Sequence, residues 1–113
     1  MKQQFQAKML RIHMGEGDRW QGKLLHEAIV EKCRELGMAG AIVYRGIEGF
    51  GSSARIRHGG HWTHPRDAPV MVSIIDTQER IDILLPHLDK MVEEGLIAMS
   101  GVEVIRYSRS TAK

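Results

Sequence analysis

The order of apolar patterns along the chain is the feature that most restricts its fold. A strand pattern, a helical pattern and a second strand pattern follow one another, and the same order occurs again in the second half. The predicted strands cover Met9–Met14, residues 41–48, Pro69–Ile75 and Val102–Tyr107, and the predicted helices cover residues 21–36 and 76–95. This β-α-β-β-α-β order predicts an α+β fold, a ferredoxin-like split βαβ with an antiparallel four-stranded sheet and two helices on one face.

Local signals set the expected helix boundaries. Gly37 lies where a C-cap glycine is favoured after the first helix. Asp76 and Glu79 match a capping box, with Asp76 as the N-cap of the second helix. Pro86 lies inside that helix and is expected to kink or split it, because proline removes one hydrogen bond and clashes with the preceding turn. Apolar residues on the sheet face away from the helices predict self-association.

Composition favours one small domain spanning residues 1–113, with a flexible tail at 108–113. The content of 42% hydrophobic and 27% charged residues is typical of a globular chain. No apolar run approaches the roughly 20 residues that span a bilayer, and Met1–Gln6 lacks the apolar stretch of a signal peptide. The single cysteine, Cys33, suits a reducing compartment and is expected in the core. We therefore expect a cytoplasmic protein that is not inserted into a membrane.

The two halves are separated by Gly46–Arg66, a segment rich in glycine, histidine and arginine. Structureless connections longer than about 12–15 residues are uncommon in compact domains and tend to be functional. From Arg45 to Arg66 there are four arginines and one glutamate, so the net charge of +2 is concentrated here. Nucleic-acid binding predicts a wider basic face with interleaved aromatic residues, so a local phosphate or carboxylate partner fits better and no nucleic acid is expected.

The start of this segment carries a family resemblance. Gly46–Gly51, which follows a strand, resembles the Lys-Gly-Phe-Gly sequence that opens the T-loop of PII-type signalling proteins. Over roughly residues 8–107 the chain is similar to a little-characterised family of PII-like proteins. The matching segments are Arg11–Asp18, Tyr44–Gly51, Val92–Leu96 and Val102–Tyr107.

The resemblance implies a function and an assembly. PII-like proteins are homotrimers that bind adenine nucleotides in clefts between subunits, and a mobile T-loop docks on a membrane transporter, an enzyme or a regulator. Residues 49–67 would be the T-loop here, with its base at Gly49, Phe50 and Gly51. Gly95–Gly101 would stand in for the second ligand loop, and Arg106 for a C-terminal basic residue that meets phosphates.

The ligand is therefore expected to be a small anion, an adenine nucleotide such as AMP, ADP or ATP, with no required cofactor. The second loop contains no lysine, unlike that of PII proteins, which favours a monophosphate over a triphosphate. The Gly15–Asp18 turn offers carboxylates to a ribose or a cation, or simply connects a strand to a helix. The candidate ligand-binding residues are Gly49, Phe50, Gly51, Ser52, Ser53, Arg55, Gly95, Leu96, Arg106 and Glu16.

Alternatives to a non-catalytic regulatory protein come from the same segment. His58, His61 and His64 are spaced so that they could hold Zn²⁺ or another transition metal, or could only tune the charge of a polar loop. A small enzyme acting on a nucleotide is a further alternative. We expect no enzyme, because no nucleophile or oxyanion site accompanies the one acid–base pair in view, His13 with Glu16 or Asp18.

Overall fold

The computed structural model describes residues 1–51, 54–59 and 68–109. Within these residues, the longer strands and the helices follow the predicted order β-α-β-β-α-β, and short strands lie in the connections between them. In chain order the elements are β1 (Lys2–Gly15), β2 (Arg19–Trp20), β3 (Lys23–Leu24), α1 (Leu25–Glu35), β4 (Ala41–Arg45), β5 (Glu48–Gly49), β6 (Arg57–His58), β7 (Pro69–Asp76), α2 (Gln78–Met91) and β8 (Leu96–Tyr107).

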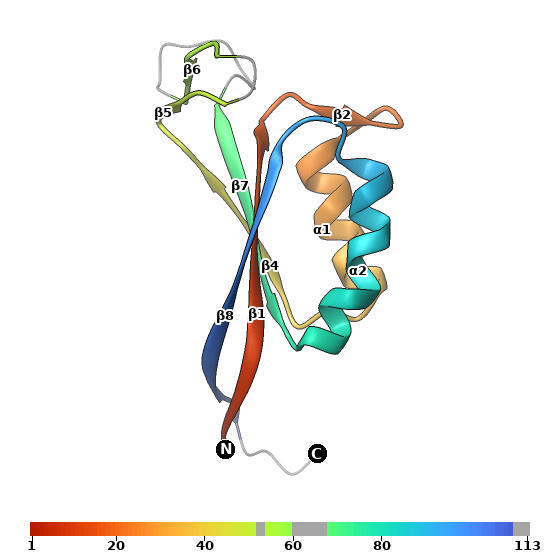
Figure 1. The fold of residues 1–113 in the computed structure, drawn as a ribbon, viewed down its shortest axis with the longest axis vertical. Coiled ribbons are helices and arrows are strands. Elements are labelled where there is room, and N and C mark those ends of the chain that lie inside the picture. The colour runs from red at the N-terminus through yellow and green to blue at the C-terminus, as the bar shows by residue number, and fades with distance from the viewer. Residues whose placement is uncertain (52–53, 60–67, 110–113) are drawn as a thin grey trace.

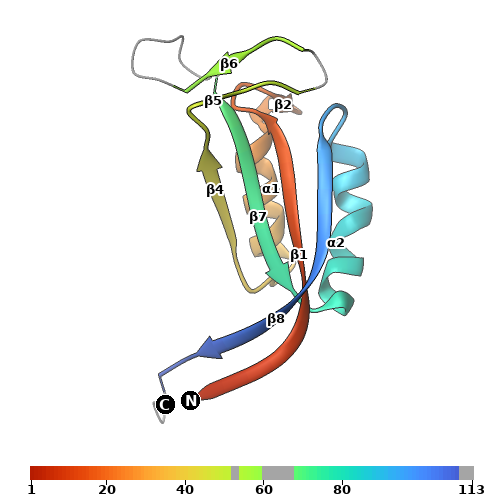
Figure 2. The ribbon, with the colours of Figure 1, turned by 60° about the vertical axis from the view of Figure 1, so that its left-hand side comes forward.

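The four longer strands form one antiparallel sheet in the order β4-β7-β1-β8. Both helices lie on the same face of this sheet, and β5 and β6 lie beyond one end of it (Figure 1). The same arrangement is seen from a second direction in Figure 2. The two central strands, β7 and β1, are each followed by a helix, as in a split βαβ unit. The predicted ferredoxin-like α+β fold is confirmed.

The core lies between the helices and the sheet face that they cover. Alternate residues of a strand point to the same face, and the register pairs Leu10 with Ile74 and Ile12 with Val72. All four side chains are fully buried. The helices cover them with fully buried side chains of their own, Ile29, Ile81, Leu84 and Leu88.

Cys33 belongs to this core, as predicted. Burial, with a smaller contribution from Asp76, raises the pKa of the Cys33 thiol from 9.0 to about 11. The thiol is therefore neutral at physiological pH, and it packs as a small apolar side chain rather than acting as a nucleophile.

The opposite face of the sheet is covered by none of the described elements (Figure 2). Its apolar side chains follow from the register, since Tyr44 pairs with Met71, and His13 pairs with both Met71 and Leu96. Ile42 and Tyr44 on β4 are 59% and 50% exposed, and Leu96 on β8 is 58% exposed. An uncovered apolar face of this kind was expected from the strand patterns, and it is where self-association would bury most apolar surface.

The first and last strands of the chain are longer than their sequence patterns predict, whereas β4 ends at Arg45 rather than at residue 48. β1 begins at Lys2 rather than Met9, and β8 begins at Leu96 rather than Val102. The residues added to β1 pair with the predicted part of β8, so that Lys2 lies opposite Tyr107, and this two-stranded ribbon continues past the helices (Figure 1). The prediction of a loop over Gly95–Gly101 is wrong beyond Gly95, because Leu96–Gly101 pairs with β1 throughout. The connection from α2 to β8 occupies only residues 92–95.

Three helix boundaries also differ from the prediction. α1 begins at Leu25 rather than residue 21, because Arg19–Leu24 forms a tight β2–β3 hairpin that turns at Gln21 and Gly22, both with positive φ. The second helix ends at Met91 rather than near residue 95. Its N-cap is Thr77 rather than Asp76. The Thr77 hydroxyl accepts a hydrogen bond from the Arg80 amide at 3.3 Å.

Asp76 has a different role from the predicted capping box. It is buried, and its carboxylate accepts a hydrogen bond from the Ala39 amide at 2.8 Å, which ties the end of β7 to the turn after α1. Gly37 takes its predicted place at the end of α1 with φ of 73°. Pro86 does not split α2, which is one helix from Gln78 to Met91.

Candidate functional site

The chain reverses direction after β4 and forms a small hairpin above the end of the sheet. The Gly46 amide donates to the carbonyl of Pro69 at 2.7 Å, so the reversal is fixed to the first residue of β7. β5 then pairs with β6, with Glu48 opposite His58 and Gly49 opposite Arg57. The Gly59 amide donates to the Ile47 carbonyl at 2.9 Å and closes the hairpin. The start of the predicted loop is therefore an ordered structure held against the sheet.

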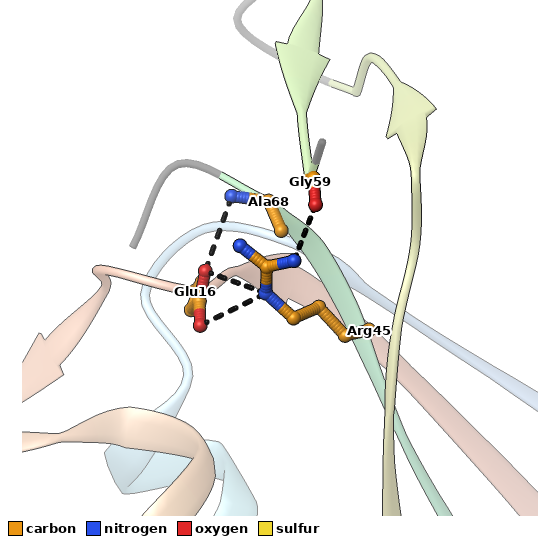
Figure 3. Close-up of polar contacts among 4 residues, drawn as sticks. All are labelled: Glu16, Arg45, Gly59 and Ala68. Carbon is orange, nitrogen blue, oxygen red and sulfur yellow. Dashed lines mark hydrogen bonds and ion pairs between the residues drawn. The ribbon is translucent and has the colours of Figure 1, made fainter. Parts of the chain in front are cut away.

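Four residues from distant parts of the chain close the base of this hairpin (Figure 3). The Glu16 carboxylate accepts from Arg45 Nε, with both oxygens at 3.2 Å, and Arg45 Nη1 donates to the Gly59 carbonyl. The Ala68 amide donates to Glu16 Oε1 at 3.4 Å, and the Glu16 amide donates to the Ala68 carbonyl at 2.8 Å. We call Glu16, Arg45, Gly59 and Ala68 the clasp. It joins the end of β1, the end of β4 and both sides of the long connection.

Gly59 has no space for a side chain within the clasp. A Cβ atom built there would overlap the carbonyl oxygen of Gly46 and lie 3.0 Å from the Cβ of Ala68. Because the blocking atom belongs to the backbone, it cannot move aside as a flexible side chain could. Glycine at this position is therefore a requirement of the closed base.

A pocket of about 460 Å³ lies between this hairpin and the end of the sheet. Its size is in the range of small-molecule sites. Its walls are the ends of the central strands, the segment after β4 and the turn before β8. The lining residues are His13, Met14, Gly15, Asp18, Tyr44, Arg45, Gly46, Glu48, Gly49, Phe50, Gly51, Arg57, Pro69, Val70, Met71, Glu94, Gly95 and Leu96.

The pocket extends onto the uncovered face of the sheet. Tyr44, Met71 and Leu96 line it, and all three belong to that face by the strand register. A second copy packed on the uncovered face would therefore also border the pocket.

Two glycines give the pocket its shape. Gly95 has φ of 144°, and a Cβ there would lie 2.5 Å from the carbonyl oxygen of His13, so the turn before β8 runs directly against β1. A Cβ at Gly15 would lie 2.7 Å from Cζ of Arg57, so the guanidinium of Arg57 occupies the space that glycine leaves. The Asp18 carboxylate accepts from the Gly15 amide at 3.0 Å and holds the neighbouring turn.

The structure brings together five of the predicted ligand-binding residues. Gly49, Phe50, Gly51, Gly95 and Leu96 all line the pocket. Leu96 does so from the first position of β8 rather than from a loop. Glu16 lies beside the pocket rather than in its lining, and acts on it through Arg45, which does line it.

The other predicted residues lie elsewhere. Arg55 is exposed and is not in the pocket lining. Arg106 is on the ribbon ten positions along β8 from Leu96, with its guanidinium 5.4 Å from the centre of the Phe5 ring, so it does not reach the pocket of its own chain. Ser52 and Ser53 lie outside the described residues.

Arg57, Glu48 and Glu94 line the pocket but were not among the predicted ligand-binding residues, whereas Asp18 belongs to the turn that was predicted to offer carboxylates. Arg57 is half-buried and lines the pocket, whereas Arg55 and Arg106, which were favoured among the arginines, do not. The one sequence signal for Arg57 was its place in the basic segment, which it shares with three other arginines.

The metal hypothesis falls mostly outside the described residues. His58 is exposed on β6, and His61 and His64 belong to the part of the chain that the structure does not describe. Among the described residues there is no group of three or more histidine, cysteine or acidic side chains that could hold a metal ion. Nor does the described part of the chain contain a helix long and apolar enough to cross a membrane.

Comparison with known proteins gives matches over most of the chain. Residues 7–104 match the protein family DUF190, described as "Uncharacterized ACR". A UPF0166 protein of Aquifex aeolicus is 37% identical over 98 residues, which cover 87% of this chain and 92% of that protein.

Two solved structures share the fold. CPII of Thiomonas intermedia K12, bound to ADP and bicarbonate, has a TM-score of 0.68 and 17% identity, covering 90% of this chain and 91% of that chain. A second CPII structure, described as a nitrogen regulatory PII-like protein bound to ADP, AMP and bicarbonate, has a TM-score of 0.65 and 18% identity over the same shares. At this identity the likeness establishes a PII-like fold.

Proposed function

Because the chain belongs to the DUF190 family and has a PII-like fold, we propose that it is a non-catalytic regulatory protein that binds an adenine nucleotide. The pocket at the base of the β5–β6 hairpin carries this proposal. It is large enough for a nucleoside with its phosphate, and it is lined by glycine backbone, apolar side chains and a few charged groups. Both CPII structures are bound to ADP, and one of them is also bound to AMP, which supports the same class of ligand here.

In this proposal ligand binding is coupled to the long connection between β4 and β7. Gly49, Phe50 and Gly51 line the pocket and lead directly into it. A ligand that contacts these residues favours one arrangement of the connection over another and so changes which partner it binds. The partner is a protein, a membrane transporter or a regulatory protein in the cytoplasm, and residues 49–66 contact it.

We also propose that the working form is a homotrimer. The uncovered sheet face presents Ile42, Tyr44 and Leu96, each at least half exposed, and association would bury them. Since that face shares Tyr44 and Leu96 with the pocket, the ligand would lie between copies. Arg106 would then reach the pocket of a neighbouring copy from the ribbon.

The test is a nucleotide titration of the purified protein followed by thermal unfolding. A ligand at about 100 times its dissociation constant adds roughly 2.7 kcal/mol to the free energy of unfolding, a rise of several degrees in the midpoint for a domain of this size. Light scattering on the same samples gives the number of copies, which we expect to be three.

Two valine variants distinguish nucleotide binding in the pocket from a general effect of the nucleotide on stability. A Cβ at Gly51 meets nothing within 4 Å, so Gly51→Val keeps the fold but narrows the pocket. We expect this variant to lose the rise in unfolding midpoint that the nucleotide causes. Gly101 is equally open but lies on β8 outside the pocket, so Gly101→Val should keep the rise in midpoint caused by the nucleotide. If no adenine nucleotide raises the midpoint of the wild-type protein, the proposed function is wrong.

A further inference from the structure

Arg57 is the pocket side chain best placed to receive an anion. It is half-buried, and its guanidinium lies against Gly15 in the space that the missing Cβ leaves. Its guanidinium makes no hydrogen bond or ion pair with the described residues, although it has five N–H donors. A guanidinium held in a pocket with its donors unused is suited to a phosphate, which it can bind through two parallel hydrogen bonds.

The second arginine of the pocket is already engaged. Arg45 Nε is shared between the two oxygens of Glu16, and Arg45 Nη1 donates to the Gly59 carbonyl. Moving Arg45 onto a ligand would open the clasp and leave the Glu16 carboxylate, which is only 19% exposed, without its cation. Arg45 therefore contributes to the shape of the pocket more than to its capacity for anions.

The remaining charged side chains of the lining are carboxylates. Among the described residues that line the pocket, these are Asp18, Glu48 and Glu94, together with two arginines and no lysine. Each further phosphate of a nucleotide brings negative charge toward these carboxylates, and like charges at short range repel one another. The lining is therefore matched to a ligand with one phosphate group.

We propose that the pocket selects a nucleoside monophosphate, AMP, over ADP and ATP, and that Arg57 is the residue that binds its single phosphate. This proposal rests on the proposed function, because it specifies the ligand of the same pocket. The glycine at position 15 is part of the site, since any side chain there would displace the guanidinium of Arg57.

The experiment is calorimetric titration of the full chain with adenosine, AMP, ADP and ATP. EDTA is present throughout, so that no divalent cation offsets the charge of the longer nucleotides. Wild-type protein is expected to bind AMP about tenfold or more tightly than adenosine, as for a charge-assisted hydrogen-bonded pair, and more tightly than ADP or ATP. In Arg57→Gln the affinity for AMP falls to that for adenosine, while the affinity for adenosine changes by less than about twofold.

The matched control is Arg55→Gln, which removes an arginine from the same hairpin but outside the pocket lining. It is expected to keep the full preference for AMP over adenosine. Circular dichroism of each variant checks that the fold is intact, and the wild-type ranking of nucleotides tests the proposal without any variant.

The outcomes separate this inference from the proposed function. If ATP or ADP binds more tightly than AMP, or if Arg57→Gln keeps the preference for AMP over adenosine, the selection by Arg57 is wrong while nucleotide binding stands. If the folded wild-type protein binds none of the nucleotides, both proposals fail.

Discussion

The two ends of β1 differ in how they are held. At its C-terminal end, Gly15 and Glu16 meet Arg57, Arg45 and Ala68, which come from three later parts of the chain. At its N-terminal end, residues 2–6 pair with β8 alone, and most of them are exposed. One end of the strand is therefore packed against several segments and borders the pocket, and the other end contacts β8 alone and forms the ribbon. The two ends of the strand therefore do different things: one end shapes the pocket, and the other extends the surface of the domain.

The kinds of contact differ as well. At the pocket end two glycines lie directly against backbone atoms, Gly95 against the His13 carbonyl and Gly59 against the Gly46 carbonyl. At the ribbon end flexible side chains lie against each other, such as Arg106 over the ring of Phe5. Backbone atoms cannot move without moving a strand, whereas side chains can turn away. Substitutions should therefore cost much more at the pocket end than at the ribbon end.

The largest expected effect is at Gly95. In Gly95→Ala the new Cβ would lie 2.5 Å from the His13 carbonyl at a φ of 144°, a backbone conformation that alanine rarely adopts. We expect a loss of about 3 kcal/mol in the free energy of unfolding, measured by urea denaturation. The control is Gly101→Ala, where the space is open and the change should stay under about 1 kcal/mol. Equal losses in the two variants would contradict the contrast between the ends of the sheet.

A smaller effect is expected from opening the clasp. Glu16→Gln keeps the shape of the side chain but removes the charge that holds Arg45, at a cost of about 1 kcal/mol. Hydrogen exchange at the Gly59 amide, which donates to Ile47, should accelerate about fivefold, while exchange in the β1–β7 ladder changes little.

The control for the clasp is Glu31→Gln, which removes an ion pair with Lys23 in which both side chains are more than half exposed. It should leave Gly59 exchange as in the wild type. If the two variants behave alike, Glu16 is an ordinary surface charge and not part of a closed base.

The smallest effect is expected on the ribbon. Phe5→Ala removes the ring beneath Arg106, and an exposed cation–π pair contributes about 0.5–1 kcal/mol. A double-mutant cycle with Arg106→Gln, followed by urea unfolding, measures that coupling directly. If Phe5→Ala lowered the free energy of unfolding as much as Gly95→Ala, the ribbon would be part of the cooperative core.

The fold was predictable because the buried strands and helices carry their own periodicity. Leu10, Ile12, Val72 and Ile74 alternate as a half-buried sheet requires, and these residues form the core. The ribbon was not predictable, because Lys2–Gln6 shows no alternation and is a strand only by pairing with β8. The predicted N-cap of α2 is one residue early, because Asp76 and Thr77 are both good N-caps, and Asp76 accepts a hydrogen bond from the Ala39 amide instead.

The glycines that line the pocket could be predicted from the sequence, but most of its charged side chains could not. Gly49, Gly51 and Gly95 mark places where the backbone borders the pocket, and a resemblance in short motifs was enough to find them. Arg55 and Arg57 are indistinguishable in sequence. Only the pairing of β5 with β6 and the space at Gly15 place Arg57 in the pocket. Arg106 was favoured for its position near the C-terminus, and the length of β8 carries it away from the pocket of its own chain.

The clasp has a consequence for how this chain can change over evolution. The Gly46 amide is bonded to Pro69, and the Glu16 amide to Ala68, so both ends of the connection from β4 to β7 are fixed on the body of the domain. Once the ends of a connection are held together, doubling its length costs only about 0.6 kcal/mol in closure entropy. The length of this connection is therefore only weakly coupled to the stability of the fold, so a lineage could acquire a new partner without rebuilding the clasp.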